Sequence, residues 1–174
     1  MQTGQPSQIA RGAAAYRAIH QRLDGGVTFS DPFAARILDD ETRARLDETA
    51  ADPSLRPWRL FIAARSRFSE DTLSACVARG VRQVVVLGAG LDTFSLRNSH
   101  AGQDVRVFEV DYPATQGWKR ERLKQAGLAV PASLTFAPVD FERQSLADGL
   151  SAAGFQASRP AFFQWLGVVP RRSR

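Results

Sequence analysis

The first half of the chain carries the hydrophobic pattern of helices. Apolar residues recur at steps of three and four over 7–24 and from Pro57 to about Arg79, which predicts two amphipathic helices. Between them, Asp31 followed by Pro32 predicts a short helix with the aspartate as its N-cap, since proline fits the first helical position. The longer helix is expected to turn four apolar side chains inward: Leu60, Ala64, Phe68 and Leu73.

From Gly80 onward the apolar residues form continuous runs. Such runs are typical of strands that are buried on both faces, as in a parallel sheet. Helix-forming segments lie between them, at about 113–126 and 144–153, so the sequence predicts βαβ units in an α/β, Rossmann-like doubly wound parallel sheet. Pro138 indicates an edge strand, because a central strand would lose a backbone hydrogen bond there. The runs interpreted as strands are 83–87, 105–110, 134–139 and 161–166.

Charge and composition exclude several classes of function. The formal net charge is +5, but the arginines are scattered among acids and not interleaved with aromatic residues, so we expect no nucleic-acid partner. Cys76 is the one cysteine, and neither histidine has neighbours at ligand spacing, so no metal site is expected. The sequence contains neither the apolar core of a signal peptide nor an apolar run long enough for a membrane span. We therefore expect a cytoplasmic protein without a membrane partner.

Candidate binding residues follow three of the predicted strands. Gly88 and Gly90 come directly after the first strand and allow a tight turn that a ligand can approach closely. Asp111 ends the second strand, where a carboxylate can accept the hydroxyls of a ribose. After the third strand, Asp140 can accept from an adenine amino group and the ring of Phe141 can pack on the base. The carboxyl ends of parallel strands meet at one edge, so these residues predict a nucleoside site.

Two residues after the glycines bear on the choice of cofactor. The dinucleotide fingerprint needs a third glycine, and the chain has Thr93 in its place. Asp92 puts a negative charge where a pyrophosphate would lie. S-adenosyl-L-methionine has no phosphate and carries a positive sulfonium, so the pattern favours it over NAD. An NAD-binding Rossmann protein remains the alternative from the residues alone.

The motifs around these positions resemble the leucine carboxyl methyltransferase family, a group of class I S-adenosylmethionine-dependent methyltransferases with bacterial O-methyltransferase relatives. The similarity covers roughly residues 10–168. It rests on the segments FSDPFAARIL, AARSRF, RGVRQVVVLGAGLDTFSLR and VFEVDYPATQGWKRERL. The resemblance implies methylation of a carboxyl or hydroxyl oxygen on a small-molecule acceptor, with S-adenosyl-L-methionine as the cofactor.

The resemblance also implies roles for individual residues. The two glycines would line the cofactor, Asp111 would hold its ribose, and Asp140 with Phe141 would frame its adenine. Arg65, in the matching Ala-Arg element, would pair with the cofactor's carboxylate. A carboxylate acceptor needs no general base, whereas a hydroxyl would need one. We assign no catalytic residue.

The resemblance divides the chain into three regions. These are an N-terminal helical cap over 1–79, a cofactor-binding half-domain over 80–168 and a basic tail over 169–174. The family's sheet has seven strands in the order 3-2-1-4-5-7-6, and four are recognisable, so we expect a truncated fold. The fourth strand would then be an exposed apolar edge that favours self-association. The alternative function is a remnant that at most binds S-adenosyl-L-methionine, with little or no methyl transfer.

Overall fold

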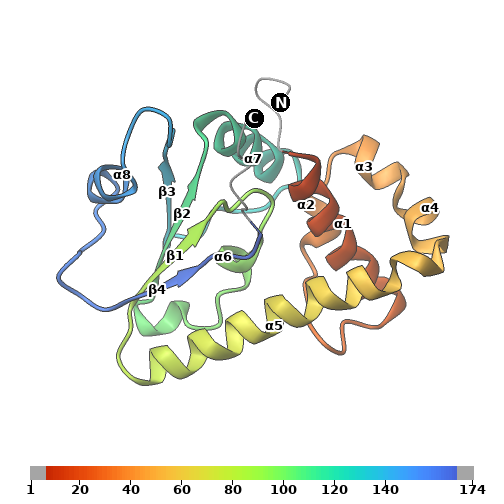
Figure 1. The fold of residues 1–174 in the computed structure, drawn as a ribbon, viewed down its shortest axis with the longest axis horizontal. Coiled ribbons are helices and arrows are strands. Elements are labelled where there is room, and N and C mark those ends of the chain that lie inside the picture. Colours follow the sequence, from red (N-terminus) through yellow and green to blue (C-terminus); the bar gives the residue numbers. More distant parts are fainter. Residues whose placement is uncertain (1–6, 168–174) are drawn as a thin grey trace.

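A four-stranded parallel sheet forms the centre of the chain (Figure 1). The structure is a computed structural model that describes residues 7–167, so the predicted basic tail lies outside it. The strand order β3-β2-β1-β4 follows the first four strands of the order that the resemblance implies. The predicted α/β fold is confirmed, and within the described residues Pro138 lies on an edge strand. The strands are β1 Gln83–Leu87, β2 Arg106–Asp111, β3 Leu134–Pro138 and β4 Ala161–Gln164.

Helices cover both faces of the sheet. On one face, Leu73 and Val77 of helix α5 (Arg56–Ala78) pack against strand residues that include Val84 and Val107. Helix α7 lies on the same face, because its Lys119 bonds to Glu109 of β2. On the opposite face, Leu150 of α8 joins the cluster of alternate strand residues. The helices after β1 are α6 Phe94–Arg97, η2 Ala101–Gln103, α7 Pro113–Gln125 and α8 Leu146–Ala152.

The N-terminal helices pack beside the sheet and against α7. A hydrophobic cluster joins residues of α1 and α2 to Leu91 and Leu123, so the core crosses the predicted boundary at residue 79. The division into cap and half-domain stays a prediction. Within residues 7–167, no helix is both long and apolar enough to cross a membrane. The N-terminal elements are α1 Gln8–Leu23, α2 Ala34–Ile37, α3 Asp40–Ala44, α4 Leu46–Ala51, η1 Pro53–Leu55 and α5 Arg56–Ala78.

The predicted inner face of α5 was partly wrong. Leu73 is buried, but Phe68 is 74% exposed and Ala64 is exposed. Small side chains occupy much of the buried stripe, which lets α5 approach its neighbours closely, and the Ser66 hydroxyl donates to the Ile62 carbonyl within the helix. The stripe consists of Arg59, Ile62, Ala63, Ser66, Ser69, Leu73 and Val77.

The predicted N-cap of the second helix was also wrong. Helix α2 begins at Ala34, with Phe33 in the N-cap position. The Phe33 amide donates to Oδ1 of Asp31 at 3.2 Å, so the aspartate orders the turn before the helix. Its other oxygen is engaged by the distant Arg17, and this pairing draws Asp31 into the core.

Candidate functional site

The parallel strands β1, β2 and β3 lie side by side and end at one edge of the sheet, which is its carboxyl edge (Figure 1). Leu87, just before the glycine loop, is in register with Val110, and Asp111 is in register with Pro138. The segments that follow β1, β2 and β3 therefore leave the sheet side by side, as the sequence predicted. The structure brings Gly88, Gly90, Asp111 and Asp140 to this edge.

The loop after β1 needs its glycines. Gly88 and Gly90 both have positive φ, at 61° and 47°. A Cβ atom on Gly90 would lie 2.9 Å from the Cβ of Ala10 in α1, so a side chain there would be both strained and crowded. The loop is anchored to β2 by the Ala89 amide, which donates to the Val110 carbonyl at 3.1 Å. These contacts hold the glycine backbone close to the strand ends.

Asp111 is bonded to the glycine loop. Its Oδ2 accepts from the Gly90 amide at 2.6 Å and its Oδ1 from the Tyr112 amide at 2.7 Å. Burial raises the pKa of Asp111, although both amide bonds and the charge of Lys119 oppose the shift. An ionised carboxylate has about four acceptor positions, so both oxygens can accept another hydrogen bond. Asp111 can therefore order the loop and hold a hydroxyl-bearing ligand at once.

Asp140 and Phe141 lie in the turn that follows β3. Oδ1 of Asp140 accepts from the Glu142 amide at 3.1 Å, and Oδ2 lies 3.6 Å from Nε of Arg143. Phe141 is 59% exposed, so a large part of its surface is open to a planar ligand. Asp140 therefore has a structural role in the turn besides the predicted one.

Arg65 projects from α5 beside the chain that leaves β4. Its Nε is buried and has no hydrogen-bond partner among the described residues. Burial lowers the pKa of Arg65, the charge of Arg17 lowers it further, and Asp92 opposes the shift. A Cβ atom on Gly167 would lie 3.0 Å from Nη1, so the arginine is held close to the backbone after β4. An anionic group at this position would supply the missing acceptor.

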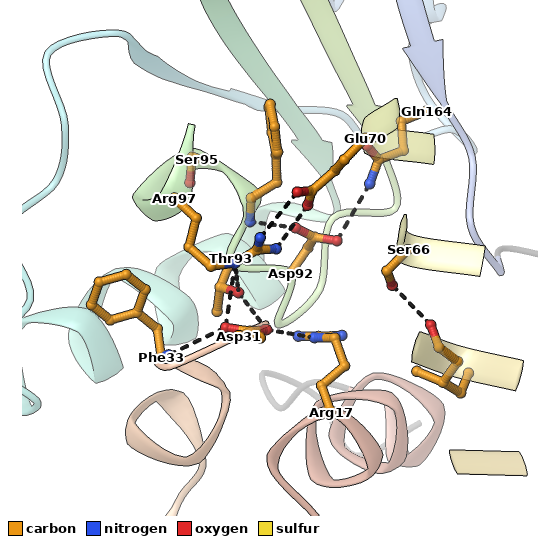
Figure 2. A network of polar contacts seen from close by, with 12 residues as sticks. Arg17, Asp31, Phe33, Ser66, Glu70, Asp92, Thr93, Ser95, Arg97 and Gln164 are labelled. Atoms are coloured by element: carbon orange, nitrogen blue, oxygen red, sulfur yellow. Dashed lines mark hydrogen bonds and ion pairs between the residues drawn. The ribbon is translucent and has the colours of Figure 1, made fainter. Parts of the chain in front are cut away.

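A buried ionic network behind the glycine loop was not predicted (Figure 2). Asp31 Oδ2 receives hydrogen bonds from Arg17 Nε and from Thr93 Oγ1, both at 2.7 Å. Burial would raise the pKa of Asp31, but the charges of Arg17 and Arg97 and the Thr93 bond hold it below its ordinary value. Arg97 continues the network to Glu70 of α5 with two bonds, at 2.9 and 3.1 Å. The features of the sequence that could have pointed to this network were Asp31 in its Asp-Pro element and Thr93 beside the glycines.

A second buried pair supports the loop from the side of α7. Lys119 Nζ lies 2.6 Å from both Glu109 Oε2 and the Asp92 carbonyl. The Ser95 hydroxyl donates to the other oxygen of Glu109 at 2.8 Å. Burial raises the pKa of Glu109, opposed by the Lys119 charge and by the bonds from Lys119 and Ser95. Because the lysine joins β2 to the loop, the position of Asp92 depends on a charge pair that is almost wholly buried.

Asp92 connects the loop to the last strand of the sheet. Its Oδ1 accepts from the Phe94 amide at 2.6 Å, and its Oδ2 lies 3.4 Å from Nε2 of Gln164 at the end of β4 (Figure 2). The negative charge that the sequence predicted beside the glycines is thus fixed at the carboxyl edge. In the part of the chain that the structure describes, no group of three His, Cys, Asp or Glu residues is placed to hold a metal ion.

Comparison with known proteins gives one consistent result. The family model described as leucine carboxyl methyltransferase matches residues 10–170. A Bacillus subtilis protein with the name "Putative S-adenosyl-L-methionine-dependent methyltransferase YktD" is 38% identical over 140 residues, covering 80% of this chain and 44% of the relative. A Mycobacterium avium protein with the same description is 36% identical over 175 residues, covering 92% of this chain and 54% of the relative. The chain thus spans about half the length of these curated relatives.

Proposed function

The chain belongs to the leucine carboxyl methyltransferase family, and from this we propose that the carboxyl edge of its sheet binds S-adenosyl-L-methionine for methyl transfer to an oxygen of a small molecule. The observation that carries the proposal is the bond between Asp111 and the Gly90 amide. It sets an acidic acceptor directly beside the glycine loop that follows β1. When bound, the cofactor supplies a methyl group on a positive sulfonium.

The residues at the edge suit the chemical groups of this cofactor. Asp111 has spare acceptor positions for the ribose hydroxyls. Asp140 would accept from the adenine amino group, and the exposed ring of Phe141 would pack on the base. Arg65 would donate to the carboxylate of the methionine part, because its buried Nε lacks an acceptor among the described residues. Asp92 adds a negative charge, which favours a sulfonium and disfavours a pyrophosphate.

The proposed acceptor is a carboxyl or hydroxyl oxygen. A carboxylate attacks as the ionised group and needs no general base, whereas a hydroxyl requires one to take its proton. The residues of this chain act by binding and by orientation, and we propose no catalytic residue. The experiment that separates transfer from simple binding is incubation with labelled S-adenosyl-L-methionine and a panel of carboxylic acids and phenols. Cofactor binding without transfer to any of them would favour the binding-only alternative.

Calorimetry tests the cofactor directly. We expect S-adenosyl-L-homocysteine to bind the chain more tightly than NAD does. Asp111→Ala should weaken that binding by about 1–3 kcal/mol, since hydrogen bonds to a charged acceptor are lost. Asp47→Ala is the matched control, because Asp47 is exposed and pairs only with Arg22 in the bonds that the structure shows. Tighter binding of NAD would contradict the proposal.

A further inference from the structure

Three arginines converge on a cavity between α2, α3 and α7. The cavity has a volume of about 500 Å³ and is lined by Arg36 of α2, Arg43 of α3 and Arg122 of α7, with Asp40 as its one acidic lining residue. The lining therefore carries an excess of positive charge. The cavity lies at the C-terminal end of α7, whereas Asp111 immediately precedes Tyr112, the N-cap of that helix. A helix of 13 residues is roughly 20 Å long, so the cavity is well separated from the carboxyl edge.

Backbone carbonyls hold the three side chains in position. Arg36 donates to the Ala126 carbonyl at 3.0 Å, and Arg43 donates to the Leu38 carbonyl at 3.0 Å. Arg122 also donates to the Leu38 carbonyl, so one oxygen ties α3 and α7 together. Because these bonds restrict the guanidinium groups, a ligand would have less ordering to impose on them, which favours binding.

Most of the donors of these arginines remain available. Each guanidinium carries five N–H donors. The bonds in the structure use one from Arg36 and two each from Arg43 and Arg122. The Nε of Arg122 is buried and has no hydrogen-bond partner among the described residues. A buried charged donor without an acceptor is costly, and a ligand in the cavity would bind to the other free N–H groups of the three arginines.

We propose that this cavity binds the phosphate group of a small molecule. A phosphate accepts hydrogen bonds from several directions, which matches guanidinium groups that arrive from three different helices. A single carboxylate accepts hydrogen bonds in one plane and could satisfy fewer of these guanidinium groups. An anion would also balance the remaining positive charge, since one of the three arginines faces Asp40 and the charge of Arg122 is partly offset by Asp39. The site is independent of the cofactor proposal.

Inorganic phosphate is the probe for this site. We expect calorimetry at constant ionic strength to show saturable binding to the chain. Arg36→Gln and Arg43→Gln together should weaken it by roughly tenfold or more, because two charge-assisted contacts are lost. Arg122 is left intact, so its ties to Leu38 and Gln125 are preserved. Arg143→Gln is the matched control, because that side chain is highly exposed and lies after β3.

Two outcomes would overturn the proposal. One is the absence of saturable phosphate binding by the unsubstituted chain. The other is equal weakening by the double substitution and by Arg143→Gln, which would indicate general charge attraction. If the double variant unfolds, Arg36→Lys alone keeps the charge and removes the planar donor set. A loss of affinity with Arg36→Lys, and not with Arg143→Lys, would support the site.

Discussion

Arg17 and Asp31 form a buried ion pair, with 2.7 Å between Nε and Oδ2, that joins α1 to the turn before α2. The same two residues reach the loop after β1, since Arg17 donates to the Leu91 carbonyl at 2.8 Å and Asp31 accepts from Thr93. The pair therefore connects the N-terminal helices to the glycine loop. A ligand that orders the glycine loop would therefore also affect the packing of α1, through this ion pair.

Asp31→Asn should destabilise the fold strongly. The substitution keeps the shape but leaves Arg17 and Arg97 without their shared counter-charge in a buried setting. Removing one partner of a buried pair costs about 3–5 kcal/mol. Urea unfolding measures the change. Asp47→Asn, which breaks an exposed pair with Arg22, should cost less than about 1 kcal/mol. Similar losses in the two variants would show that burial does not decide the effect.

The contribution of Asp31 should depend on pH in a defined direction. Burial by itself would raise the folded-state pKa of Asp31. The charges of Arg17 and Arg97 outweigh burial and hold this pKa below the ordinary 3.8. As pH falls below 3.8, the unfolded chain takes up the proton first, so the stabilisation is present above this value and is lost as pH falls through the folded-state pKa.

Unfolding free energies of the unsubstituted chain and of Asp31→Asn, measured across the acid range, test this dependence. The difference between the two should be constant well above pH 3.8 and should shrink below it. Subtracting the variant removes the contributions of Asp24 and Asp39, whose pKa values are also lowered. A difference that stays unchanged into acid would contradict the assignment.

The sequence predicted the sheet better than the contacts behind its loop. Continuous apolar runs marked the strands, and Pro138 marked an edge, because a proline cannot donate to a neighbouring strand. The place of Asp111 followed from strand polarity alone. The contact of Asp31 with Thr93 spans 62 positions, and no local pattern specifies such a partner. For the same reason periodicity identified the helix α5 but did not show that Phe68 would face solvent.

Lys119→Met should destabilise the chain through Glu109. The lysine is the charge partner of this fully buried carboxylate, and its loss leaves only the Ser95 hydrogen bond against burial, which raises the pKa of Glu109 further. We expect a loss of about 3–5 kcal/mol in urea unfolding near neutral pH. The additional change Glu109→Gln should recover part of it, because no charge then remains buried. A double variant as unstable as the sum of the single variants would show that the two residues do not interact.

Phe163→Lys should reduce self-association. Phe163 in β4 is 49% exposed and Trp165 beyond it is 57% exposed, so apolar surface flanks a strand that pairs only with β1 among the described residues. Burying such a side chain between two copies contributes roughly 1.5–3 kcal/mol. The net charge of +5 opposes association, and salt screens this repulsion.

Light scattering over a salt series tests the edge. We expect the unsubstituted chain to associate more as salt rises and Phe163→Lys to remain smaller at every salt concentration. Phe68→Lys is the matched control, because Phe68 is equally aromatic and more exposed but belongs to α5 and not to the strand. If both lysine variants reduce association equally, added charge and not the β4 edge is the cause. A chain that stays monomeric at every salt concentration would contradict association through this strand. High salt screens the charge repulsion, so the exposed apolar surface of β4 should then drive association if it can.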